Sequence, residues 1–250
     1  MQIQLIRNAS LKIQIADRII LVDPMLGAKG SFMSFAGVEE NPTVDLPFPA
    51  EEFIQEIDFI LLTHTHIDHW DPEAIRLLDK DIPVFCQPED LEKIEGQGFT
   101  RVTSIDEHTK FEGIDIIRTK AQHGTGEVLE LMGPVSGYIL DNPEEPTVYI
   151  IGDSVLTEEV KNTCEEYQPE IVIANSGGAY MPDYPANAIL MDAAETALLA
   201  DFIYPYLLIC VHSEALDHCT VSREELELIA MANKNRNMYI PQDGDIMDFQ

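Results

Sequence analysis

Residues 63–70, Thr-His-Thr-His-Ile-Asp-His-Trp, concentrate metal-binding side chains in one short segment. His64, His66 and His69 lie within six residues of chain, together with Asp68. Neutral imidazoles and carboxylates bind transition metals when several of them converge on one point. In extended backbone, residues two apart point the same way, so His64 and His66 can chelate one ion. Where the chain then turns, Asp68 and His69 can bind a second ion nearby, so one loop could serve two metals.

The elements around this segment predict that it lies at the end of a strand. Residues 57–62 before it are apolar, which predicts a buried strand. Asp71-Pro72-Glu73 after it predicts the start of a helix, with proline in the first turn. Loops on a rigid scaffold are where α/β proteins place their chemistry. The alternative is a histidine-rich surface loop, but histidines and an aspartate clustered at a strand end favour a metal site.

The motif His64-x-His66-x-Asp68-His69 resembles the signature of the metallo-β-lactamase-fold hydrolases. The remaining ligands of that family follow in the same order, each after a predicted strand: His123 after residues 114–122, Asp153 after 147–152 and His212 after 207–211. Gly152-Asp153-Ser154 resembles the family's bridging-aspartate motif, although the same tripeptide also suits a helix N-cap. The resemblance covers nearly the whole chain.

The resemblance implies a cofactor of two divalent metal ions, with Zn²⁺ as the first choice and Mn²⁺ or Fe as alternatives. The first metal would take His64, His66 and His123, the second would take Asp68, His69 and His212, and Asp153 would bridge them. Asp68, Asp153 and His212 are also the predicted catalytic residues. The nucleophile would be a water or hydroxide between the metals, since metal binding lowers the pKa of water from 15.7 toward about 7.

Three other residues compete for these roles or lie near them. His218 follows His212 closely, but it lies in an acidic segment beside a predicted helix, so we expect it at the surface. Cys210 is expected in the core, because free cysteine is among the most buried residue types. His108 lies in a polar segment that predicts a solvated turn between strands.

Composition limits the class of protein. The chain has 250 residues, 45% of them hydrophobic, so we expect a single domain over residues 1–250 with a large core. Its 15 Lys and Arg against 45 Asp and Glu give a net charge of −30, which argues against binding nucleic acid. The four cysteines show no CxxC pair, and the N-terminus lacks a signal-peptide apolar stretch. No apolar run approaches the roughly 18 residues of a membrane span. These features predict a cytoplasmic protein, and nothing in the sequence indicates an oligomeric state.

The hydrophobic pattern predicts antiparallel strands followed by an alternation of strands and helices. Apolar and polar residues alternate in the opening strands, expected at 2–7, 10–15 and 18–22. Further strands are expected at 82–86, 101–105, 111–120, 136–140, 147–151, 170–174, 207–211 and 238–240, and helices at 72–79, 88–95, 156–166, 187–201 and 222–233. The pattern fits an α+β fold with two sheets faced by outer helices. The resemblance implies the same four-layer αββα sandwich, with the metals at one edge between the sheets.

Two loops are candidates for the substrate pocket. Residues 24–50 form an insertion rich in proline, glycine and aromatic residues, which could be a lid or pocket wall or could pack onto the core. The second loop follows residue 174, and its Tyr180, Met181 and Tyr184 could line the pocket. The alternative for this loop is a glycine-rich turn before a helix.

The predicted function is a binuclear metal-dependent hydrolase that cleaves an ester, lactone or phosphodiester bond of a small polar substrate. The chain resembles the cytoplasmic branch of the family that includes L-ascorbate-6-phosphate lactonase. One alternative is a non-catalytic metal-binding or sensing module, which an intact ligand set disfavours. The other is a di-iron redox enzyme on the same fold, which is disfavoured because that branch typically has glutamate where this chain has His66.

Overall fold

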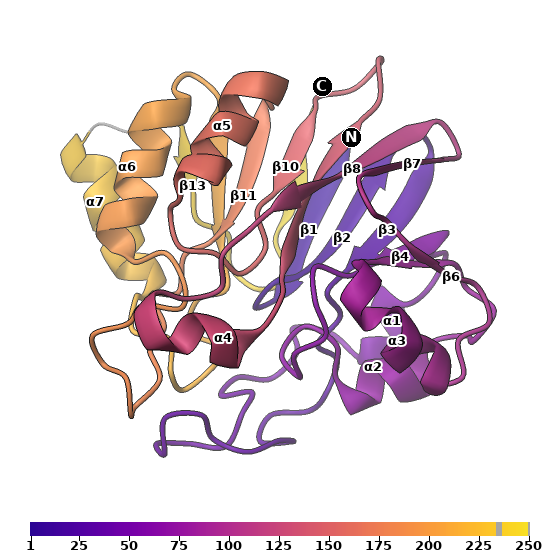
Figure 1. The fold of residues 1–250 in the computed structure, drawn as a ribbon, viewed down its shortest axis with the longest axis horizontal. Helices are drawn as coiled ribbons and strands as arrows, with labels where there is room; N and C mark the ends of the chain where they lie inside the picture. The colour runs from indigo at the N-terminus through magenta and orange to yellow at the C-terminus, as the bar shows by residue number, and fades with distance from the viewer. Residues whose placement is uncertain (234–236, 250) are drawn as a thin grey trace.

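Two sheets of seven strands each make up the β structure of residues 1–233 and 237–249, the part of the chain that the computed structural model describes (Figure 1). The first sheet has the order β14-β1-β2-β3-β4-β5-β6 and the second has the order β13-β12-β11-β10-β9-β8-β7. The strands of the first sheet are β1 Gln2–Arg7, β2 Ser10–Ile15, β3 Arg18–Val22, β4 Phe59–Leu61, β5 Val84–Cys86, β6 Val102–Ser104 and β14 Ile246–Asp248. Those of the second are β7 His108–Phe111, β8 Ile114–Lys120, β9 Ser136–Asp141, β10 Val148–Ile150, β11 Ile171–Asn175, β12 Leu207–Val211 and β13 Met238–Tyr239.

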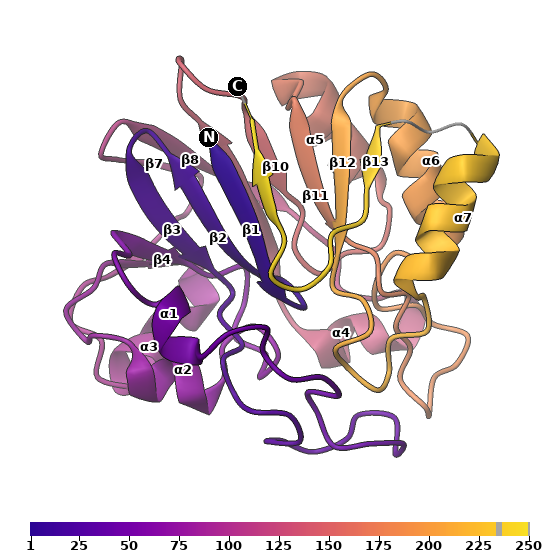
Figure 2. The same ribbon diagram turned by 180° about the vertical axis from the view of Figure 1, so that it is seen from behind.

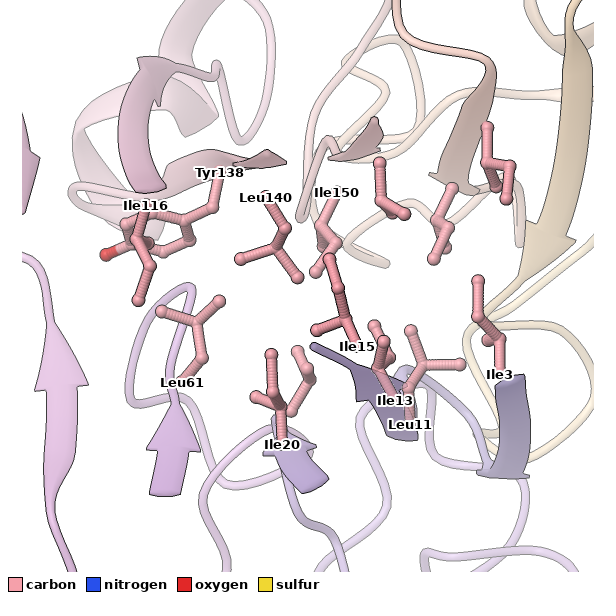
Figure 3. Close-up of a cluster of buried hydrophobic side chains, with 14 of the residues drawn as sticks. Ile3, Leu11, Ile13, Ile15, Ile20, Leu61, Ile116, Tyr138, Leu140 and Ile150 are labelled. Atoms are coloured by element: carbon pink, nitrogen blue, oxygen red, sulfur yellow. The ribbon is translucent and has the colours of Figure 1, made fainter. Parts of the chain in front are cut away.

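The main hydrophobic core lies between the two sheets. Strand β2, Ser-Leu-Lys-Ile-Gln-Ile, shows why: its leucine and isoleucines are buried, while Lys12 and Gln14 point the other way. Figure 3 shows the inner faces meeting: Ile13 and Ile20 of the first sheet contact the same cluster as Leu140 and Ile150 of the second. The cluster has 22 buried hydrophobic members drawn from both sheets, so burial of apolar surface between the sheets stabilises the sandwich.

Helices cover the outer face of each sheet (Figure 2). The helices are α1 Ala50–Phe53, α2 Pro72–Leu77, α3 Leu91–Gly96, α4 Leu129–Met132, α5 Glu158–Tyr167, α6 Ala193–Ile203 and α7 Arg223–Asn233, with 3₁₀ turns at Pro88–Asp90 and Gly126–Val128. In one outer core, helices α1, α2 and α3 pack against the first sheet. In another, helices α5, α6 and α7 pack against the second sheet. The predicted αββα sandwich is confirmed. We propose that residues 1–250 form one domain, since both sheets share the central core. None of the helices in the described residues is both long and apolar enough to cross a membrane.

Some elements differ from the sequence prediction. The strand expected at 111–120 is a hairpin, in which β7 pairs with β8 around a turn at Glu112 and Gly113. His108 therefore begins a strand and not a solvated turn, although it remains exposed and contacts Asp115 at 2.8 Å. The short strand β14 was not predicted; it pairs with β1 and completes the edge of the first sheet. The predicted strand at 238–240 is present as β13.

The strand directions bring distant loops to one edge of the sandwich. In the second sheet, β10, β11 and β12 are parallel to one another. Strand β9 is antiparallel to both β8 and β10, so β8 also runs with them. Because the carboxyl ends of parallel strands meet at the same edge, the loops after β8, β10, β11 and β12 gather there.

Candidate metal centre

The histidine-rich loop turns sharply between its two pairs of donors. It begins after β4, and hydrogen bonds from the amides of His69 and Trp70 to the carbonyl of His66, 3.0 and 2.8 Å long, close the turn. Helix α2 follows at once, with Asp71 as its N-cap and proline at its first position, as predicted. The turn places His66 and His69 in different groups of donors, although only two residues separate them.

The other three predicted ligands come from the second sheet. His123 follows β8, Asp153 follows β10 and His212 follows β12. Gly152 places Asp153: its φ is +73°, and a Cβ there would lie 2.8 Å from the carbonyl oxygen of Ser136. His212 itself has a φ of +62°, an uncommon conformation that is often associated with functional sites.

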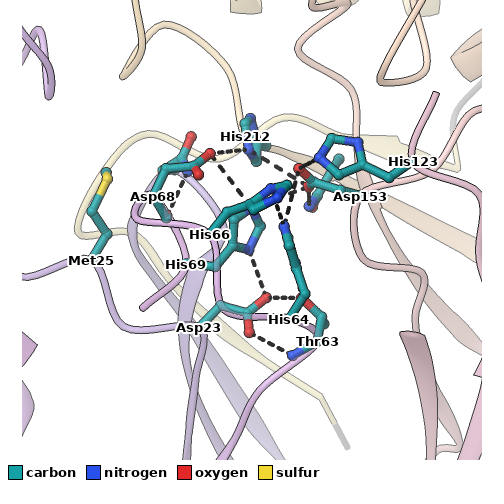
Figure 4. Close-up of polar contacts among 12 residues, drawn as sticks. Asp23, Met25, Thr63, His64, His66, Asp68, His69, His123, Asp153 and His212 are labelled. Carbon is teal, nitrogen blue, oxygen red and sulfur yellow. Dashed lines mark hydrogen bonds and ion pairs between the residues drawn. The ribbon is translucent and has the colours of Figure 1, made fainter. Parts of the chain in front are cut away.

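The seven predicted ligands meet in two adjacent groups (Figure 4). The first group contains His64, His66 and His123, and the second contains Asp68, His69, Asp153 and His212. Within each group, one donor atom from every member lies within 4.8 Å of the others. The structure therefore brings together every residue that the sequence predicted as a ligand.

Asp153 faces both groups with different oxygen atoms. Its Oδ2 lies 3.3 Å from Nε2 of His123 and 4.0 Å from Nε2 of His64. Its Oδ1 lies 3.2 Å from Nε2 of His69 and 3.6 Å from Nε2 of His212. This placement agrees with the bridging role predicted for Asp153, which stays a prediction.

The protein holds the opposite ring nitrogen, Nδ1, of four of these histidines. His69 Nδ1 donates to Asp23 at 2.9 Å, and His123 Nδ1 donates to the carbonyl of Ile189 at 2.9 Å. The corresponding atom of His64 contacts the Thr63 hydroxyl at 3.1 Å, and that of His212 lies 3.6 Å from Cys219 Sγ. Partners of this kind orient a ligating imidazole and fix which nitrogen is free to bind.

Asp23 is a partner of the proposed ligand His69 that the sequence analysis missed. It directly follows β3, is buried and accepts three hydrogen bonds. Two come from Thr63, from its amide at 2.8 Å and its hydroxyl at 2.6 Å, and the third comes from His69. The sequence did carry a signal for this role. Asp23 is a charged residue directly after a buried strand, and that strand pairs with β4, which leads into the histidine-rich loop. Asn175 was also missed as a partner of Asp153, to which its amide donates at 2.5 Å.

The donor set fits transition-metal ions. His69 Nε2 and His212 Nε2 are buried and have no hydrogen-bond partner among the described residues. Their nearest carboxylate oxygens lie 3.2 to 3.6 Å away without making hydrogen bonds to them. Buried polar atoms without partners are costly, and a cation between these nitrogens and oxygens would satisfy both. Five imidazoles and two carboxylates suit Zn²⁺, so we keep all seven residues as proposed ligands.

The charges of the cluster also favour a bound cation. Burial lowers the pKa of His69, but the carboxylates of Asp153 and Asp68 outweigh it and raise that pKa to about 10. Burial and the neighbouring His69 and His66 hold the pKa of His64 well below its ordinary value. Without metal, protons therefore offset the carboxylates of the second group, and metal ions would displace those protons on binding.

Residues 18–213 match the family model of the beta-lactamase superfamily domain. The chain belongs to this superfamily. Among its relatives, the UPF0173 protein YddR of Bacillus subtilis strain 168 is 34% identical over 256 residues, which span 100% of both chains. The superfamily member described here is therefore a UPF0173 protein, and the recognition made from the sequence motif is confirmed.

Solved structures of two similar proteins carry the same fold over their whole length. The isothiocyanate hydrolase from Delia radicum gut bacteria is 32% identical, with a TM-score of 0.94 over 100% of this chain and 99% of that chain. A possible metal-dependent hydrolase from Veillonella parvula DSM 2008 is also 32% identical, with a TM-score of 0.95 over 99% of this chain and 98% of that chain. This beta-lactamase superfamily protein thus belongs to a family of metal-dependent hydrolases.

The competing residues lie outside the two metal groups. Cys210 is buried in the core between the second sheet and its helices, as predicted. His218 belongs to neither group. The prediction that His218 lies at the surface is wrong: its exposed fraction is 9%, because the segment after β12 folds inward against the loop at residues 24–50.

A pocket of about 380 Å³ opens above the proposed ligands His66, Asp68, His123 and Asp153. Its walls are mainly apolar and are formed by Met33, Phe35, Ile67, Met132, Tyr180, Met181, Pro182 and Ile189, with Ser34 and His218 as polar members. Among the described residues, no lysine or arginine lines it. Tyr180 and Met181 line the pocket, as predicted, whereas Tyr184 packs into a neighbouring apolar cluster.

The loop at residues 24–50 both forms a wall of this pocket and packs onto the core. Met33, Ser34 and Phe35 line the pocket, while Phe35 also joins a cluster with buried residues after β12. The Asp217 carboxylate holds this stretch by accepting hydrogen bonds from the amides of Phe35 and Ala36, at 2.9 and 3.1 Å, and from the Ser34 hydroxyl. The loop therefore forms a pocket wall and also packs onto the core, with Phe35 taking part in both. Its contact with substrate stays a prediction.

Proposed function

We propose that this protein is a binuclear metal-dependent hydrolase whose substrate is a small, uncharged electrophile with an apolar substituent. The observation that carries the proposal is the convergence of seven donors beneath an apolar pocket that four of them, His66, Asp68, His123 and Asp153, line. The likeness to an isothiocyanate hydrolase over the whole chain adds a substrate class. An isothiocyanate, R–N=C=S, has an electrophilic central carbon, no charge and a substituent R that matches these walls.

Divalent ions bound here would supply a water of lowered pKa and a Lewis acid for the electrophile. The protein residues hold the proposed ligands in fixed positions. Asp153 keeps the two groups at a fixed separation, and the contacts at Nδ1 hold the rings of His64, His69 and His123 in place. Asp68 Oδ2 faces His69 and His212, whereas its Oδ1 has no hydrogen-bond partner among the described residues. Because Asp68 lines the pocket, we assign its carboxylate to accept a proton from the attacking water.

The overall reaction adds water across the carbon–nitrogen double bond. The water oxygen bonds to the central carbon, and the electron pair of the C=N bond moves to nitrogen, which takes up one proton. The product, a thiocarbamic acid, carries the second proton and can release carbonyl sulfide to leave the amine R–NH₂. One water is consumed and no oxidant or reductant is needed.

The pocket changes the substrate expected from the sequence. Apolar walls favour an apolar substituent over the small polar substrate predicted there. A phosphodiester is the least suited of the predicted substrates, because no cationic side chain of the described residues faces the pocket. Esters and lactones remain suitable as uncharged electrophiles. The likeness to L-ascorbate-6-phosphate lactonases stays a prediction.

The test is a substrate panel with metal analysis. Purified protein is assayed for metal content and then with allyl and benzyl isothiocyanate, aryl esters, lactones and bis(p-nitrophenyl) phosphate. We expect bound zinc and the fastest turnover with benzyl isothiocyanate. His66→Ala should abolish turnover, while His108→Ala, at an exposed histidine that belongs to neither donor group, should not. Protein that binds no metal, or His66→Ala with unchanged activity, would refute the proposal.

A further inference from the structure

His218 lies in the substrate pocket without a ligand role. It comes from the segment after β12, and its ring meets the Phe35 ring edge to face, with centroids 5.0 Å apart and planes at 80°. It lines the same pocket as Asp68 and His123. It is absent from both groups of converging donors, so metal binding does not account for it.

The His218 ring is buried but unpaired. Nδ1 is inaccessible to solvent and has no hydrogen-bond partner, and no hydrogen bond to Nε2 is present among the described residues. Burial lowers the pKa of His218 to about 4, so the ring is neutral near pH 7 and carries one N–H donor and one acceptor nitrogen. A buried polar group without a partner costs folding free energy, and no hydrogen bond from the protein compensates this cost for Nδ1. Nδ1 is inaccessible, so the ring nitrogen that a molecule in the pocket can contact is Nε2, which is not among the buried atoms without a partner.

We propose that His218 is a substrate-contacting residue, which donates a hydrogen bond to the heteroatom that gains electron density as water attacks the central carbon. This inference rests on the proposed function. In an isothiocyanate that atom is the nitrogen, or the sulfur, of the N=C=S group. The imidazole keeps its proton throughout, so it acts as a preorganised neutral donor rather than an acid. Because the pocket walls are apolar, this hydrogen bond is not weakened by competing water.

A neutral donor also contributes to specificity. It favours an uncharged substrate whose acceptor atom lies next to His218. Because the ring carries no net charge, it does not attract an anion. Together with the absence of lysine and arginine from the described pocket walls, this predicts low activity toward phosphorylated substrates.

The test compares two substitutions. His218→Phe has a similar shape and keeps an edge-to-face contact with Phe35, but it has no donor. His218→Asn keeps an amide donor. With benzyl isothiocyanate we expect kcat/KM to fall about 100-fold in His218→Phe, as when an oxyanion-hole donor is removed, and to be partly restored in His218→Asn. Metal content should equal that of the wild type in both.

Thermal stability separates this role from a structural one. Removing a buried, unpaired imidazole relieves its desolvation, so His218→Phe should melt at the same temperature as the wild type or higher. Unchanged kcat/KM, loss of metal, or a lower melting temperature in His218→Phe would each overturn the inference. If the wild type turns over none of the panel, the proposed function fails. The melting temperatures then decide alone: a lower value in His218→Phe overturns the inference, and an equal or higher value supports a ligand-binding role.

Discussion

The Asp23→Asn substitution tests whether the partner of a ligand controls the metal centre. Asp23 Oδ1 accepts from the Thr63 amide, and Oδ2 accepts from both the Thr63 hydroxyl and His69 Nδ1. Asparagine has nearly the same shape and tolerates the φ of +43° at this position, so the backbone should not change. However, the amide N–H of the new side chain would point at the N–H of His69, so two donors would face each other.

The expected defect is in metal affinity. To avoid the clash between donors, His69 must move its proton to Nε2, which removes the lone pair aimed at the second group, or the amide must flip and oppose the Thr63 amide instead. Loss of such a partner costs about 10- to 100-fold in metal affinity or activity. This corresponds to about 1.4 to 2.7 kcal/mol at 25 °C.

The assay is competition for Zn²⁺ with a chromogenic chelator, followed by turnover at saturating metal. Asp192→Asn is the matched control, because it makes the same change from carboxylate to amide at the N-cap of α6, at a residue outside both donor groups. Burial raises the pKa of Asp23, so replacing its charge with an amide should not weaken the metal-free fold. A metal affinity equal to that of the wild type would refute the argument that Asp23 sets the state of His69.

Three further predictions follow from the structure. Gly177→Ala should destabilise the fold by roughly 1–3 kcal/mol and reduce metal content, because the new Cβ would lie 2.1 Å from the His212 carbonyl oxygen; Gly96→Ala, where a Cβ contacts nothing within 4 Å, is the control in the same urea titration. Asp217→Asn should destabilise the protein at pH 7, and the difference should shrink as the pH falls below about 3.8, because hydrogen bonds hold the folded pKa of Asp217 below its unfolded value despite burial; a constant difference across pH would contradict this. Chelation of the metal should lower the melting temperature, since an ion present at 100 times its Kd contributes about 2.7 kcal/mol, and an unchanged calorimetric scan after chelation would contradict metal binding by the folded state.

The sequence predicted those features that depend on local pattern. The alternating strands at 2–7, 10–15 and 18–22 appear with these bounds, because one face of each packs between the sheets. The order of donors after strands 114–122, 147–152 and 207–211 was sufficient to bring every predicted ligand into the cluster. Both successes come from side-chain periodicity and strand direction, which are visible along the chain.

The failures involve contacts between distant segments. Strand β14 pairs with β1 across almost the full length of the chain, and its three residues carry too little pattern to predict a strand. His218 has polar neighbours in sequence, but the loop at residues 24–50 covers it in space. Asp23 also looks like an ordinary turn residue until the metal loop is placed beside it. In each case the environment is set by tertiary packing, which a local pattern does not encode.

The position of Asp153 has a thermodynamic consequence for loading the site. Its two oxygens face different groups, so an ion in one group would fix the carboxylate that the other group also needs. The two binding events are therefore linked, and any change in the affinity of one position appears reciprocally in the other. The first ion would order the carboxylate for the second, while its positive charge would oppose the second ion. The balance of these two effects decides whether singly loaded protein accumulates during a metal titration.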